Sequence, residues 1–103
     1  MSTIGTFTKN GDRFDGYIRT LNLNLPSVSF VPVDHRGNDN APNYRAFSGQ
    51  AEFGAAWTKE SKNQDEYISV LLDDPGMSAP ISCALVQAEG DTWNLVWSRP
   101  TNK

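Results

Sequence analysis

Cysteine is nearly missing from this sequence, since Cys83 is the only one among 103 residues. A single thiol excludes an internal disulfide and a zinc site built from several cysteines. His35 is likewise the only histidine, which argues against a histidine-based general base or zinc ligand set. A domain of this length can bury roughly two-thirds of its unfolded surface. We therefore expect a core that needs neither a disulfide nor a metal, and no cofactor.

Long apolar runs and basic stripes are also absent. No stretch approaches the ~20 apolar residues that cross a membrane, and the start, MSTIGTFTKNGD, lacks the basic-then-apolar pattern of a signal peptide. We therefore expect a cytoplasmic protein without membrane contact. Nine basic residues stand against twelve acidic ones, for a net charge of −3. The basic residues are scattered singly, which argues against tight binding to duplex DNA.

What the sequence does contain is a side-chain period of two. In DTWNLVWSRP, Trp93, Leu95 and Trp97 share one face, which is typical of a half-buried strand. The apolar positions shift by one residue at Pro26, which predicts a bend or bulge in a long strand. Turn signals such as Asn10-Gly11 recur about every ten residues, and no segment has a long helical pattern. We predict one all-β domain over residues 1–103, an antiparallel barrel or sandwich of about seven to eight hairpin-connected strands with little helix.

Aromatic residues offer the main candidate binding surface. Trp57, Tyr67 and Tyr17 are of the type that stacks on single-stranded nucleic acid, where one ring contributes about 1–3 kcal/mol per base. The opposing interpretation is burial, because rings supply a large apolar area to a small core. We favour burial for all three tryptophans, and Tyr17, which lies on a polar face next to Arg19, is the better candidate for an exposed ring. With nearby cations added, the candidate binding residues are Tyr17, Arg19, Tyr44, Arg45, Trp57, Lys59, Lys62 and Tyr67.

No catalytic constellation stands out. Asp73 and Asp74 are adjacent, so in a strand they point to opposite faces, and Pro75-Gly76 after them indicates a turn. Cys83 lies between apolar positions, which predicts a buried and inert thiol. The polar segment at residues 34–42 is typical of a surface loop and lacks calcium-loop spacing. We expect no enzyme activity, no metal site and no small-molecule substrate.

Several longer blocks resemble one family. The blocks are TIGTFTKNGDRFDGYIRTL, DNAPNYRAF, EFGAAWTKESKNQDEYISVLLDDP, and APISCALV followed by WNLVWSR. Together they resemble the bacterial domain-of-unknown-function family 736 over residues 3–99. The resemblance implies a small cytoplasmic accessory protein, of a kind often encoded beside plasmid-transfer and integrative-element genes, and it implies no catalytic residue. Leu71 departs from the family, in which a lysine is common at that position.

Three functions remain open. We favour a binding module that acts by protein–protein contact or as a homodimer, with the hairpin at residues 53–72 as the contact region. The first alternative is a single-stranded nucleic-acid binder that uses the residues named above. The second is an inhibitor that mimics DNA, which requires acidic side chains to gather on one side, namely Asp12, Asp15, Glu60, Asp65, Glu66, Asp73 and Asp74.

Overall fold

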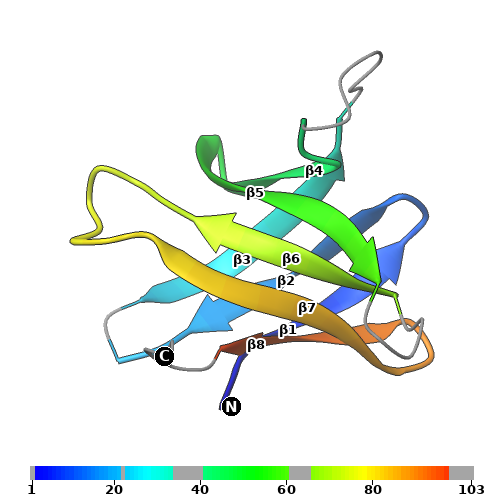
Figure 1. Ribbon diagram of the computed structural model, residues 1–103. Coiled ribbons are helices and arrows are strands. Elements are labelled where there is room, and N and C mark those ends of the chain that lie inside the picture. Colours follow the sequence, from blue (N-terminus) through cyan, green and yellow to red (C-terminus); the bar gives the residue numbers. More distant parts are fainter. Residues whose placement is uncertain (1, 22, 34–40, 61–65, 98–103) are drawn as a thin grey trace, which may run out of the picture.

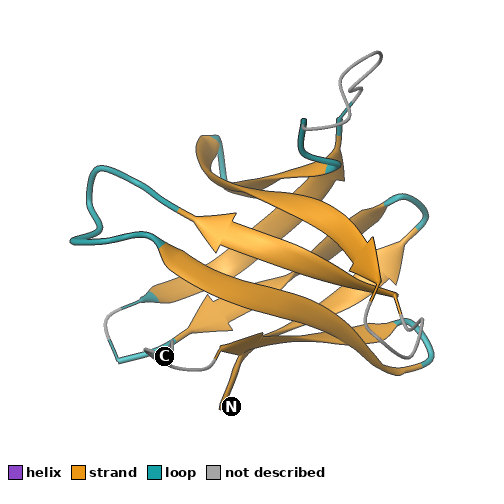
Figure 2. Cartoon of the chain, viewed as in Figure 1, coloured by secondary structure: helices purple, strands orange, loops and turns teal. Residues whose placement is uncertain are grey.

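The computed structural model describes residues 2–21, 23–33, 41–60 and 66–97. Most of the polar loop predicted at residues 34–42, together with Lys62 and Asp65, lies outside this description. Within it the chain forms strands and no helix (Figure 2). The strands are β1 (Ser2–Asn10), β2 (Arg13–Arg19), β3 (Asn24–Pro32), β4 (Tyr44–Ser48), β5 (Ala51–Glu60), β6 (Glu66–Leu72), β7 (Ile81–Glu89) and β8 (Thr92–Trp97).

The strands close into an antiparallel barrel. Each strand pairs with the next one in the sequence, and β8 pairs with β1 to complete the ring (Figure 1). The all-β prediction is therefore confirmed, and of its two forms the structure shows the barrel. Because the sheet closes on itself, the barrel has two ends. We call the end where β1 leads to β2, and β7 to β8, the mouth; β6 leads to β7 at the opposite end.

The barrel interior explains the two-residue period. Alternate side chains on every strand point inward and pack together, with Phe7 and Phe30 at a ring-centroid distance of 5.0 Å. Trp93 is buried as predicted, with 5% of its surface exposed. The buried set is Phe7, Phe14, Ile18, Val28, Phe30, Ala46, Phe53, Ala56, Ile68, Val70, Leu72, Leu85, Trp93 and Leu95.

Glycine allows two strands to approach closely inside the barrel. A Cβ atom added to Gly16 on β2 would lie 2.0 Å from the Thr6 carbonyl oxygen on β1. The register of β2 and β3 also shifts here, between the pairs Gly16↔Val28 and Ile18↔Leu25. β3 accommodates one more residue than β2 in this interval, which confirms the irregularity predicted at Pro26.

A second register shift corrects the prediction for Trp57. β5 pairs Glu52 with Phe47 and then Gly54 with Ala46, so Phe53 is an extra residue in the strand. Phe53 is buried, but Trp57 no longer shares its face, because the bulge changes the alternation. Trp57 lies on the outer face and is half-buried. The expected burial of this indole in the core is therefore wrong.

β6 ends in the turn that the sequence predicts. The Gly76 N–H donates a 2.8 Å hydrogen bond to Asp74 Oδ2, and the Met77 N–H donates one of 2.8 Å to the Asp74 carbonyl. The Met77 side chain packs against the core at this end of the barrel. The aspartate therefore has a local structural role in the β6–β7 connection.

Candidate functional site

The predicted binding residues separate into two groups on opposite sides of the barrel. Tyr17 and Arg19 lie on β2, whereas Trp57, Lys59 and Tyr67 lie on β5 and β6. In the closed order β2 and β6 are four strands apart in either direction. Figure 1 shows β5, β6 and β7 in front and β2 and β3 behind them. No single groove on the outer surface of the described strands therefore joins the two groups.

Two further candidates do not contribute to either group. The Tyr44 ring meets Phe14 edge-on at a centroid distance of 5.6 Å, so it belongs to the inner face. The Arg45 guanidinium forms an ion pair with Glu52 on the neighbouring strand. A cation already paired with a carboxylate is a weaker phosphate ligand. Of these candidates, Trp57, Lys59 and Tyr67 are the ones that adjacent strands bring together.

The outer surface of β5, β6 and β7 carries an apolar patch, which we call the Trp57 face. Trp57 lies opposite Ser69, and Leu71 lies opposite Ala55. Leu71 has 38% of its surface exposed, although it is apolar. Small residues between the large ones make this surface accessible to a partner. The Trp57 face consists of Ala55, Trp57, Tyr67, Ser69, Leu71 and Ala84, with Lys59 at its mouth end.

Beside this face, at the barrel mouth, the wall opens between β6 and β7. These strands pair from Leu72↔Ile81 to Ile68↔Leu85, but not beyond. From there, among the described residues, β6 pairs with β5 alone and β7 pairs with β8 alone. A pocket of about 660 Å³ occupies the opening, within the range of ligand sites. This mouth pocket is lined by Lys9, Glu66, Tyr67, Val86, Gln87, Gly90, Asp91 and Trp93.

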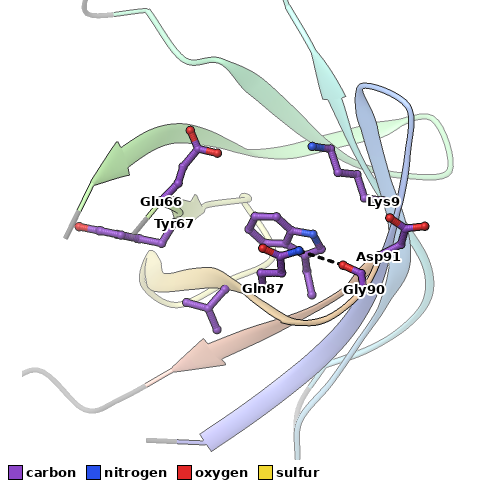
Figure 3. A pocket seen from close by; sticks show the side chains of 8 residues that line it. Lys9, Glu66, Tyr67, Gln87, Gly90 and Asp91 are labelled. Carbon is purple, nitrogen blue, oxygen red and sulfur yellow. Dashed lines mark hydrogen bonds between the residues drawn. The ribbon is translucent and has the colours of Figure 1, made fainter. Parts of the chain in front are cut away.

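Polar groups surround the mouth pocket. Figure 3 shows Glu66 and Tyr67 on one side and Lys9 and Asp91 on the other. The Gln87 side chain lies between them, and its Nε2 donates a 2.9 Å hydrogen bond to the Gly90 carbonyl. The charged lining consists of two carboxylates and one ammonium group.

Trp93 contributes a buried donor without a partner to this pocket. Its Nε1–H is shielded from solvent and has no hydrogen-bond acceptor among the residues that the structure describes. The indole is held in place by Phe14, whose ring meets it edge-on at 5.2 Å. A buried donor without an acceptor costs about 1–3 kcal/mol, so natural structures seldom keep one.

The mouth pocket was not predicted from the sequence, although the residue pattern of β7 contains a signal for it. Ile81, Cys83 and Leu85 alternate on the inner face of β7, and Gln87 continues that face. A polar amide at a core-facing position indicates that the interior becomes polar there. The separation of β6 from β7 carries no such signal, because it depends on pairing between strands.

The described acidic residues proposed as a DNA-like face divide between the two ends of the barrel, and Glu60 lies at the mouth end of β5. Asp12 and Glu66 lie at the mouth, where their charges add to the larger effect of burial and raise the pKa of Tyr44. Asp73 and Asp74 follow β6 at the opposite end of the barrel. The arrangement therefore separates Asp73 and Asp74 from the acidic residues at the mouth.

Cys83 lies on the inner face of β7, where it pairs with Val70. Burial raises the pKa of its thiol to about 12. Cys83 is partly buried, less than the sequence predicts, and because the thiolate is the reactive form we expect its thiol to react slowly at neutral pH.

Residues 2–21, 23–33, 41–60 and 66–97 offer neither a metal-binding cluster nor a membrane-spanning helix. Those ranges contain no group of three or more His, Cys, Asp or Glu side chains that could hold a metal ion. Nor do they contain a helix that is long and apolar enough to cross a membrane.

Comparison with known proteins places the chain in a family. No curated protein and no solved structure matches it. Residues 3–100 match the family described as "Protein of unknown function (DUF736)". This range includes every strand from β2 to β8 and nearly all of β1. The chain therefore belongs to the DUF736 family.

Proposed function

We propose that this protein is a non-enzymatic binding module that contacts a partner protein through the Trp57 face. The observation that carries the proposal is the exposed apolar surface on β5 and β6, with Leu71 38% exposed beside a half-buried Trp57. Contiguous apolar side chains on the outside of a barrel are characteristic of interaction surfaces. The surface lies within the hairpin at residues 53–72 that the sequence favours.

The chemistry of the Trp57 face suits protein contact. Tryptophan and tyrosine are enriched at the centres of interfaces, because they bury a large area with few rotatable bonds. The small side chains of Ala55, Ser69 and Ala84 leave room for a partner to approach those rings. The net charge of −3 does not favour a polyanionic partner.

The cellular role that we propose is that of a cytoplasmic accessory protein of a plasmid or integrative element. This part of the proposal comes from the family resemblance and concerns where the partner is found. A component of the same element is the partner that we expect.

The test is capture of the partner by the full chain from cells of the source organism. Leu71→Glu places a charge on the Trp57 face, and we expect it to abolish capture. Tyr17→Glu is the matched control, because Tyr17 is 46% exposed on the opposite side of the barrel. Equal capture by wild type and both variants would contradict the proposal. Light scattering after size exclusion shows whether the partner is a second copy of the chain.

A second candidate function is binding of single-stranded nucleic acid. It is supported by one arrangement: Lys59 pairs directly with Tyr67, and Trp57 is two residues along the same face. Rings beside a cation are typical of stacking platforms. Fluorescence anisotropy with labelled oligonucleotides at increasing salt decides between the functions. Salt-sensitive binding that Trp57→Ala removes supports this candidate, and no binding at low salt rejects it.

A further inference from the structure

The opening between β6 and β7 leaves strand edges that lack a described partner. Val86, Gln87 and Glu89 pair with β8 on one side, with a register shift between the last two, and among the described residues no strand pairs with them on the other. Glu66 and Tyr67 likewise pair with β5 alone. Backbone N–H and C=O groups at such edges form the template on which an extended peptide adds as a strand.

The mouth pocket supplies side-chain chemistry at the same place. Trp93 is 95% buried, and its Nε1–H needs an acceptor from outside the described chain. Because this atom is shielded, a neighbouring group must move before an acceptor reaches it. Gln87 lies directly opposite Trp93 in the register and is exposed, so we infer that it swings aside once its hydrogen bond to Gly90 breaks.

Charge indicates which peptide fits. Glu66 and Asp91 line the pocket against the single cation Lys9, and Asp12 adds a further negative charge at the mouth. The rings of Tyr67 and Trp93 lie in the same lining. Aromatic rings combined with carboxylates attract an ammonium or guanidinium group.

We propose that the mouth pocket binds an extended peptide segment that carries a lysine or arginine side chain. The segment pairs with the edge of β7 at residues 86–89, which lacks a described partner, and its basic side chain enters the pocket between Glu66 and Asp91. A peptide carbonyl is then available to accept the Trp93 N–H. This inference rests on the proposed function, since it names the kind of partner segment that the module recognises.

The experiment uses random heptapeptides displayed on phage and selected on the full chain. Selected sequences are expected to share one lysine or arginine flanked by residues that favour strands. The best peptide is then synthesised and titrated into ¹⁵N-labelled protein. The Trp93 indole N–H signal should shift on binding, and replacing the basic residue of the peptide by glutamate should weaken binding at least about tenfold, equivalent to about 1.4 kcal/mol.

Two variants of the protein test whether the peptide binds at the mouth pocket. Glu66→Gln is expected to weaken peptide binding about three- to tenfold, because the basic side chain of the peptide loses its charge pair with this carboxylate. Asp73→Asn removes the same charge at the opposite end of the barrel and should leave affinity unchanged. Selection without basic residues, an unmoved Trp93 signal, or equal weakening by both variants would overturn the inference.

Failure of this inference is distinguishable from failure of the proposed function. If Glu66→Gln and Trp93→Phe leave partner capture intact while Leu71→Glu abolishes it, the Trp57 face is the interface and the pocket is not a peptide site. If Leu71→Glu leaves capture intact while Glu66→Gln reduces it, the Trp57 face is rejected and the pocket remains.

Discussion

Replacing Trp93 by phenylalanine tests the unpartnered donor directly. The substitution keeps an aromatic ring against Phe14 but removes the Nε1–H that has no described acceptor. Two effects on the free energy of unfolding then oppose each other. The smaller ring loses buried apolar contacts, whereas removal of the donor ends the cost of burying it unsatisfied.

The two effects are of similar size. Phenylalanine lacks about three ring atoms of tryptophan, and each buried carbon contributes about 0.8 kcal/mol, so the packing loss is about 2 kcal/mol. An orphaned buried donor costs about 1–3 kcal/mol, which the substitution restores. The net change expected for Trp93→Phe is therefore within about 1 kcal/mol of zero. A tryptophan with a satisfied N–H would show the full packing loss together with the lost hydrogen bond.

Urea unfolding followed by far-UV circular dichroism measures this change, because that signal does not depend on the tryptophan that is removed. Leu95→Ala on the same strand is the control. Leu95 is fully buried and apolar, so its truncation should cost about 2–5 kcal/mol. A loss for Trp93→Phe as large as that of the control would refute the reasoning, since it would show that the indole N–H has an acceptor in solution.

Three further predictions concern the barrel itself. Gly16→Ala should lower the free energy of unfolding by about 3 kcal/mol or more, because the new Cβ atom meets backbone at 2.0 Å. Gly90→Ala, at φ 57° in open space, should lower the free energy of unfolding by about 1–2 kcal/mol in the same urea assay. The Cys83 thiol, with its pKa raised to about 12, should react with Ellman's reagent at pH 8 at least about a hundredfold more slowly in the native protein than in urea, and equal rates would contradict its burial. Asp15 accepts a 2.7 Å hydrogen bond from the Ser29 hydroxyl, and this bond is the main cause of the lowered pKa of Asp15. The stability that the Asp15 carboxylate contributes is present above its ordinary pKa of 3.8 and is lost as pH falls through the lower pKa of the folded state. Asp15→Asn should therefore flatten the decline in unfolding free energy between about pH 4 and pH 2.

The strands were predictable because their signal is local. Side chains one residue apart on a strand point to opposite faces, so an inward set such as Trp93 and Leu95 is readable without knowing what it packs against. The irregularity at Pro26 was readable for the same reason, since the apolar positions themselves change phase there. Turns such as that of Asp74 and Gly76 follow from residue chemistry within a few positions.

The candidate site was less predictable, because it depends on pairing between distant strands. Phe53 is an extra residue only relative to β4, and this bulge turns Trp57 outward. Tyr17 and Trp57 are both candidate binding residues in the sequence, yet closure of the ring places them on opposite sides of the barrel. Neither result is encoded in the residues next to the side chain concerned.

By itself the sequence determined an all-β domain, because alternation and turn chemistry act over a few residues and require no partner. Only the tertiary structure decided that the sheet closes, that Trp57 faces outward and that β6 and β7 separate over Trp93. Those outcomes depend on hydrogen-bond register between strands, where a shift of one residue moves a side chain from one face to the other.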